Sequence, residues 1–235
     1  GLLAVTIEQI QDAETGLLQF PLTFKVTQGK LQKNHTFPIT RKKEVFYVQK
    51  LDEGQAERVD VIVDPESTFL GEIKDNKPFF NHILTYNRAG SYIEKVRSLK
   101  ELSTLQQYDT VRFTLLSAIN DADADIRLKT LGWIDWKNPD NLTKTKELLI
   151  HLAQDDPSSA VRAKVTQILG AVKNPELLNL FNELLRDSSY TVAGEALLAL
   201  HQLLPEEAYR QCPQLEKDAR GKLFTAISEV YSKTG

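Results

Sequence analysis

The chain has 235 residues, a net charge of −3 and a single cysteine, and these properties already exclude several classes of protein. A slightly acidic balance argues against a general nucleic-acid binder, which needs a dense cationic surface for phosphate contacts. Cys212 alone cannot form an internal disulfide or a four-thiolate metal site, and we expect it to be a small apolar filler. No apolar stretch approaches the roughly 20 residues that span a bilayer, so no membrane segment is expected in this chain.

The sequence contains no methionine and begins at Gly1, directly before residues typical of a strand. An intact translation product normally begins with methionine, so we expect the chain to be a segment of a longer protein. Its length fits one large or two ordinary domains, and the pattern below favours two.

Residues 1–75 show the alternating hydrophobicity of β-strands. Apolar residues alternate or run in short bursts in these stretches: Leu3–Ile7, Leu22–Val26, Val45–Val48, Val59–Val63 and Phe69–Ile73. Turn residues separate them at Glu14–Gly16, Gln28–Lys30, Asp52–Gly54 and Asp64–Glu66. Pro21 and Pro38 lack a ladder donor, so their strands should lie at a sheet edge or begin at the proline. The pattern predicts an antiparallel β-sandwich of roughly six or seven short strands.

From residue 76 onward the hydrophobic period is that of helices. The sequence predicts helices over Phe79–Arg88, Ser91–Ser103, Tyr108–Asn120, Asp123–Asp135, Asn141–Gln154, Ser158–Val172, Pro175–Arg186 and Thr191–Leu204, and two shorter helices up to Lys233. Dipeptides ending in proline separate several of them: Asn138-Pro139, Asp156-Pro157, Asn174-Pro175 and Leu204-Pro205. Short connections predict antiparallel neighbours, and we expect the first helices to cover an edge of the sandwich.

A repeat organises the helical region. Asp121, Asp156 and Asp187 each lead a copy, and successive copies lie 35 and 31 residues apart. That period is typical of stacked helical hairpins. We expect the leading aspartates to cap their helices. The predicted fold is therefore α+β and multidomain, with a β-sandwich over residues 1–75 and an all-α HEAT-like helical-repeat solenoid over residues 76–235.

The central copy predicts which side of its helix is buried. An apolar stripe at helical spacing should pack against the neighbouring helices: Val161, Val165, Ile168 and Leu169. Polar side chains are expected on the opposite side: Arg162, Lys164 and Gln167.

No motif points to catalytic, cofactor-binding or metal-binding residues in this chain. No H-E-x-x-H occurs, and no two histidines have the i, i+4 spacing of a zinc-binding helix face: His35, His82, His151 and His201. We expect His151 and His201 to be half-buried, without a carboxylate partner. Asp121, Asp123 and Asp125 resemble the start of a calcium loop, but the glycine and glutamate that the loop needs downstream are absent. Helix capping explains these acids more simply, and Trp133 and Trp136 are expected to serve packing.

Three stretches carry a resemblance to a known family, in this order: Leu3–Gln9 with Gln19–Phe24, Val61–Leu70, and Ile83–Leu102 with its Tyr92, Arg97 and Leu99. The first resembles a strand ending in glutamine followed by an x-Pro-Leu strand. The second resembles a closing strand with its Asp-Pro turn, and the third resembles the helix pair that begins a helical domain. This order is similar to the C-terminal half of the aminopeptidase N family of gluzincin zinc metallopeptidases, and with the repeats it covers essentially the whole chain.

The resemblance implies a non-catalytic C-terminal region in which the helical domain caps the catalytic cleft and restricts peptide access. The sandwich would be a wedge between the helical domain and the catalytic domain. The partners implied are an N-terminal catalytic domain of the same polypeptide and a peptide substrate at the domain interface. Zinc would be bound in that catalytic domain, before Gly1. No zinc ligand, general base or catalytic tyrosine is carried onto this chain, which alone should not hydrolyse peptides.

The repeats also favour an interpretation from another class, a stand-alone helical-repeat scaffold that binds a protein or peptide partner. A third interpretation, a helical-repeat module that modifies a cofactor-carrying protein, is weaker because no reactive cluster accompanies the repeats.

Overall fold

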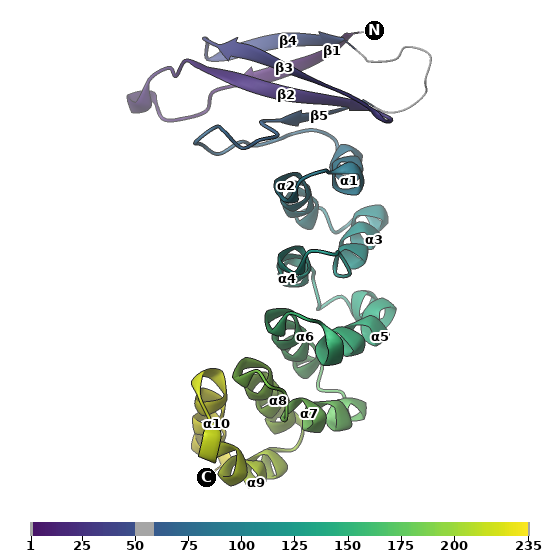
Figure 1. Cartoon of the computed structure of the whole chain (residues 1–235), viewed down its shortest axis with the longest axis vertical. Coiled ribbons are helices and arrows are strands. Elements are labelled where there is room, and N and C mark those ends of the chain that lie inside the picture. Colours follow the sequence, from purple (N-terminus) through teal and green to yellow (C-terminus); the bar gives the residue numbers. More distant parts are fainter. Residues whose placement is uncertain (1, 50–58, 235) are drawn as a thin grey trace. The chain divides into compact units, whose positions relative to one another are not determined.

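The computed structural model describes residues 2–49 and 59–234. The chain divides into two compact units, residues 1–105 and 106–235, and each is described by itself (Figure 1). The strands and the first two helices belong to the first unit, and the other helices belong to the second. The strand-to-helix change near residue 76 is confirmed, whereas the division into domains at residues 75 and 76 stays a prediction.

The first unit contains two small antiparallel sheets among its described residues. Strand β1 pairs with β4, and β2 lies between β3 and β5. Their bounds are β1 Leu2–Glu8, β2 Phe20–Gln28, β3 Leu31–Ile39, β4 Lys43–Gln49 and β5 Val59–Val63. Leu22, Phe24 and Ile39 form a buried core, and Val5 and Phe46 from the two-stranded sheet pack against it. This antiparallel β region is smaller than the sandwich that the sequence predicts.

The segment Phe69–Ile73 is not a strand, and that part of the prediction is wrong. Asp64 explains the difference. Its buried carboxylate accepts hydrogen bonds from the backbone N–H groups of Thr68 at 2.9 Å and Phe69 at 3.2 Å, which turns the chain away from a sheet ladder. Phe69 then stacks on Phe20, with ring centroids 4.7 Å apart.

Strand β3 carries too many polar residues to stand out in the sequence, and its place opposite β2 comes from the tight turn at Gly29, which has a φ of 58°. Pro38 lies on the edge strand β3, as expected. Pro21 faces it from β2, which is the central strand of this sheet, and is the second residue of that strand rather than the first. The expected turn at Asp52–Gly54 lies outside the described residues.

Ten α-helices follow in the described residues, with most bounds within two residues of the prediction. They are α1 Phe79–Arg88, α2 Tyr92–Ser103, α3 Asp109–Ala118, α4 Ala124–Trp133, α5 Pro139–Asp155, α6 Ser159–Ala171, α7 Leu178–Leu184, α8 Tyr190–Leu203, α9 Pro205–Leu215 and α10 Gly221–Thr234. A 3₁₀ turn over Pro175–Leu177 precedes α7, so this helix begins later than predicted. Helix α10 has 14 residues and is as long as α8, whereas a shorter helix was expected.

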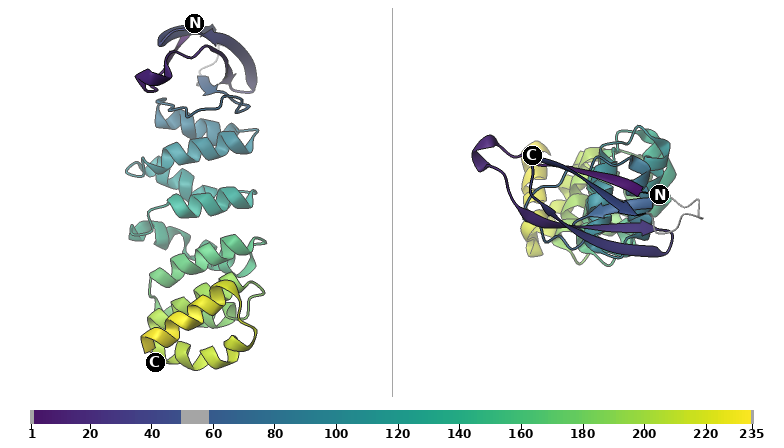
Figure 2. Two further views of the ribbon diagram at one scale, coloured as in Figure 1. Left: turned by 90° about the vertical axis from the view of Figure 1, so that its left-hand side faces the viewer. Right: turned by 90° about the horizontal axis from the view of Figure 1, so that it is seen from above.

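Within the second unit the helices form two layers (Figures 1 and 2). The even-numbered helices pack side by side, since α8 runs against both α6 and α10, and α6 also contacts α4. Gly170 on α6 permits this close approach, because a Cβ at that position would lie 2.7 Å from the Cβ of Ala199 on α8. The odd-numbered helices α3, α5, α7 and α9 form the other layer.

Two arginine–aspartate bridges join successive repeats. The guanidinium of Arg127 donates from Nε and Nη2 to the two carboxylate oxygens of Asp156, both at 2.7 Å. It also donates from Nη1 to the main-chain carbonyl of Asp121 at 2.8 Å, so one side chain ties the loop of its own repeat to the loop of the next. Arg162 repeats this geometry, with bonds of 2.8 and 2.9 Å to Asp187 and 2.8 Å to the Asp156 carbonyl.

The same aspartates also shape the loops before their helices. Asp121, Asp156 and Asp187 each accept a hydrogen bond from the backbone N–H two residues later, at 3.0, 2.8 and 2.7 Å. The acids therefore bind backbone at the helix starts, as expected, but at a different position from the expected cap. On α4 the side chain in the cap position is Asp123, which accepts from the N–H groups of Asp125 and Ile126.

The expectation for Arg162 is wrong. Its side chain is only 13% exposed and takes part in a bridge, whereas the sequence placed it on the solvent side. The hydrogen bonds with Asp187 raise the pKa of Arg162. Burial alone would raise the pKa of Asp187, but the hydrogen bonds from Arg162 and the Ser189 N–H outweigh that effect and lower it. The next equivalent position, six residues after Asp187, is Ala193, so the series of bridges ends there.

The apolar stripe gives the first prediction. Val161 is completely buried, as expected, so Val161→Asp should place an unpaired carboxylate between helices and lower the free energy of unfolding by roughly 3–5 kcal/mol. Both tryptophans lie in the second unit, so urea denaturation followed by tryptophan fluorescence reports on that unit. Gln167→Asp on the exposed side of the same helix is the control, with an expected change within about 0.5 kcal/mol. Equal losses would mean that the stripe is assigned to the wrong side.

The second bridge gives the next prediction. Arg162→Ala should cost about 1.5–3 kcal/mol, because it leaves the Asp187 carboxylate without its charged partner. A double-mutant cycle with Asp187→Ala should show coupling at neutral pH. Because the folded-state pKa of Asp187 is lowered, its stabilisation is present above about pH 4 and disappears as the pH falls through the folded-state pKa. Additive effects of the two substitutions at neutral pH would contradict the bridge.

Candidate functional site

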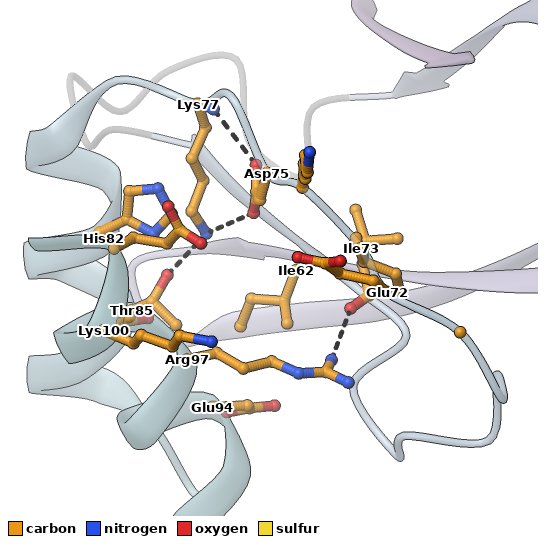
Figure 3. A pocket seen from close by; sticks show the side chains of 15 residues that line it. Ile62, Glu72, Ile73, Asp75, Lys77, His82, Thr85, Glu94, Arg97 and Lys100 are labelled. Carbon is orange, nitrogen blue, oxygen red and sulfur yellow. Dashed lines mark hydrogen bonds and ion pairs between the residues drawn. The ribbon is translucent and has the colours of Figure 1, made fainter. Parts of the chain in front are cut away.

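A cavity of about 260 Å³ lies within the first unit (Figure 3). It is lined by β5, by the segment 71–77 and by helices α1 and α2. Two polar clusters border it, one around Asp60 and Lys77 and the other around Glu94 and Arg97.

Helix α1 meets strand β5 through the first cluster. Asp60 on β5 is 1% exposed and accepts hydrogen bonds from Thr85 and, at 3.1 Å, from the side-chain amide of Asn81. The ammonium of Lys77 lies 3.2 Å from the Asp60 carboxylate and donates to the Thr85 hydroxyl at 2.9 Å. Its distance to the Asp75 carboxylate is 3.6 Å. This cluster confirms that the first helices cover an edge of the β region.

The buried imidazole of His82 lies beside this cluster (Figure 3). Its burial, and then the nearby positive charge of Lys77, lower the pKa of His82 despite the carboxylates of Asp75 and Asp60. His82 is therefore neutral at physiological pH.

The second cluster is formed by helix α2. Ser91 caps its start by accepting from the Glu94 N–H at 3.3 Å, which fixes Glu94 in the first turn. The Glu94 side chain is 3% exposed, and its Oε1 forms an ion pair with the Lys25 ammonium. Arg97 is directed elsewhere, because its Nη1 donates to the carbonyl of Asp64 at 3.1 Å.

The sequence offered one signal for this site. In β5, Asp60 shares a strand face with Ile62, opposite the valines, so an aspartate lies beside an apolar residue on a face that the structure buries. A buried aspartate needs polar partners, and Asn81, Thr85 and Lys77 supply them here. Nothing in the sequence shows that Lys77 and Glu94 line the same cavity, since this depends on the path of the segment 71–77.

The four histidines have different neighbours. His35 stacks on Phe37 in β3, and His201 pairs with Thr234 at 2.9 Å, half-buried as expected. The expectation for His151 is wrong, because its imidazole is 68% exposed and lies 3.0 Å from the Asp155 carboxylate, one helical turn away.

The other residues singled out in the sequence have structural roles. The indole of Trp136 donates to the Leu131 carbonyl at 2.8 Å, and Cys212 is a buried free thiol, as expected of an apolar filler. Burial raises the pKa of this thiol. Within residues 2–49 and 59–234, no three histidine, cysteine or acidic side chains form a group that could hold a metal ion. No described helix has the length and apolar character needed to cross a membrane.

The buried histidine gives a prediction. An NMR titration of the full chain should show a lower pKa for His82 than in the urea-unfolded chain. Because the folded-state pKa is lowered, the unfolded state binds a proton first, so His82 should reduce stability as the pH falls below about 6.5. Lys77→Gln should shift the pKa of His82 partly back upward. A pKa of His82 that is equal in the folded and unfolded chains would contradict its buried position.

Comparisons with known proteins find HEAT repeats. Residues 112–201 match a family model described as HEAT repeats. Among solved structures, one similar chain comes from the complex of CpcE and CpcF of phycocyanin lyase from Nostoc sp. PCC7120, with 15% sequence identity and a TM-score of 0.45. That alignment covers 65% of this chain and 97% of the other. No curated protein matches the chain, and none of these findings links it to aminopeptidase N, to peptidase activity or to zinc. Residues 112–201 therefore form a HEAT-repeat helical scaffold.

Proposed function

We propose that the chain is a helical-repeat scaffold that binds a protein or peptide partner on the even-numbered helices of its second unit. The observation that carries the proposal is the match of residues 112–201 to HEAT repeats. Stacked helical repeats form extended surfaces that such proteins use for binding. The alternative, a cap over the catalytic cleft of an aminopeptidase N-like protein, receives no support from the comparisons and ranks second.

The binding surface we propose follows from the repeat spacing. Equivalent positions on α4, α6 and α8 point away from the buried stripe, and we call them the outer row. The outer row consists of Asp125, Lys129, Gly132, Ala160, Lys164, Gln167, Thr191, Glu195 and Leu198. None of these side chains belongs to the buried core. The bridges below them keep the three helices in register, so a partner would meet a preformed surface.

The chemistry of the outer row indicates the kind of partner. Its charges are mixed and already engaged in local pairs, with Lys129 at 3.3 Å from Asp125, and Glu195 at 3.1 Å from Lys222. Lys164 donates to Gln167 at 3.0 Å. A surface of this kind suits a polar protein or peptide rather than nucleic acid, because it offers no dense cationic patch.

Photo-crosslinking tests the proposal. A benzoylphenylalanine at Gln167 or at Thr191, on neighbouring helices of the outer row, should yield the same crosslinked protein, identified by mass spectrometry and then purified. The matched control positions are Lys144 and Asn179, which are exposed on the odd-numbered helices α5 and α7. The purified partner should bind the full chain, and Lys164→Glu should weaken that binding at least fivefold whereas Lys144→Glu should not.

Two results would contradict the proposal. One is crosslinking that is equal on both layers, since it would show that the outer row has no special role. The other is zinc-dependent hydrolysis of aminoacyl fluorogenic substrates by the purified chain, which a non-catalytic scaffold cannot perform.

A further inference from the structure

The carboxylate of Glu94 has an unsatisfied oxygen. Glu94 is 4% exposed, and its Oε1 pairs with Lys25, but its Oε2 is buried and has no hydrogen-bond partner among the described residues. Buried carboxylate oxygens are nearly always hydrogen-bonded, because desolvating them without a partner is unfavourable. This oxygen can therefore accept a hydrogen bond from a donor that the described residues do not supply.

The surrounding space can hold more than water. Glu94 lines the cavity of about 260 Å³, whereas one water molecule needs a share of roughly 30 Å³. Ser98, one turn further along α2, lines the same cavity and supplies a hydroxyl. Ile62 and Ile73 give the cavity apolar walls from β5 and the segment 71–77 (Figure 3).

The cations that line the cavity do not supply the missing donor. Arg97 is held by main-chain carbonyls, with Nη1 at 3.1 Å from Asp64, and its Nη2 lies 3.8 Å from the Asp64 carboxylate. Lys77 faces two carboxylates, those of Asp60 and Asp75. The side chains that line the cavity include four cations and four carboxylates, so the lining as a whole has no excess charge. The preference for a cation comes from the Glu94 oxygen itself, because a charged donor forms a stronger hydrogen bond with a carboxylate than a neutral donor does.

We propose that this cavity binds an aliphatic primary ammonium group, with Glu94 Oε2 as its acceptor and the isoleucine walls around its alkyl chain. An ammonium has three donors and a compact charge, which match a carboxylate oxygen and a serine hydroxyl in a small space. The alkyl chain packs on apolar surface while the charged end meets the carboxylate. A free alkylamine and a lysine side chain of a peptide offer the same group, and the site lies in the first unit, apart from the scaffold surface proposed above.

NMR titration of the full chain tests this site. The probes are n-butylammonium, Nα-acetyl-lysine-N-methylamide and the Nε-acetylated form of the latter, which lacks the charge. The ammonium probes should shift the backbone amide signals of Glu94 and Ser98 saturably, and the acetylated probe should not. Binding of both ammonium probes with similar affinity indicates a free alkylamine, and much tighter binding of the lysine amide indicates a peptide.

A matched pair of variants locates the acceptor. Glu94→Gln should weaken binding at least tenfold, because it removes the charge while keeping the side-chain length. Glu72→Gln, an exposed carboxylate on the cavity wall, should change the affinity less than twofold. If Glu94→Gln fails to fold, the charged and acetylated lysine probes decide on the unsubstituted chain. Equal shifts with both lysine probes, or no saturable shift with any probe, would show that water alone meets Glu94 and would overturn the proposal.

Discussion

The bidentate bond between an arginine of one repeat and an aspartate of the next sets the geometry of the second unit. Arg127 and Arg162 each fix three elements at once: the loop of their own repeat, the helix that carries them and the loop that follows. Apolar contacts between helices are non-directional and would tolerate sliding, whereas a guanidinium accepts a carboxylate in one orientation. The bridges therefore specify the register in which the buried valines and leucines meet.

In the first unit, too, a buried carboxylate fixes how neighbouring elements pack. A buried carboxylate on a strand, Asp60, is satisfied by groups from helix α1 and from the segment before it. Burying this ion pair is not in itself a strong source of stability, because desolvation offsets much of the attraction. The cluster fixes the position of α1 on β5, and residues of both elements line the cavity. The unsatisfied oxygen of Glu94 stands out because every carboxylate oxygen of Asp60 is hydrogen-bonded.

The sequence predicted the helices well and the polar contacts poorly, for physical reasons. Helix bounds follow from local signals, namely the 3.6-residue hydrophobic period and proline in the first turn of a helix. Both signals occur at the starts of α5 and α9, at Pro139 and Pro205. Strand β3 was expected only through Pro38, and its bounds were not predicted because its residues are mostly polar and its pairing depends on a turn. Arg162 was misplaced because a charged side chain reads as exposed until its partner 25 residues later is known. The site around Glu94 depends on contacts of that long-range kind throughout.

The alanine at position 193 ends the series of bridges, and this affects how the stack can come apart. The helices from α3 to α8 share two directional cross-links, whereas α9 and α10 adjoin α8 through packing, the close approach of Gly194 to Lys222, and the Glu195–Lys222 ion pair. In a quasi-one-dimensional array, each element is held only by its neighbours. Separation of the last hairpin from α8 would therefore break packing contacts and the Glu195–Lys222 ion pair, but no arginine–aspartate bridge.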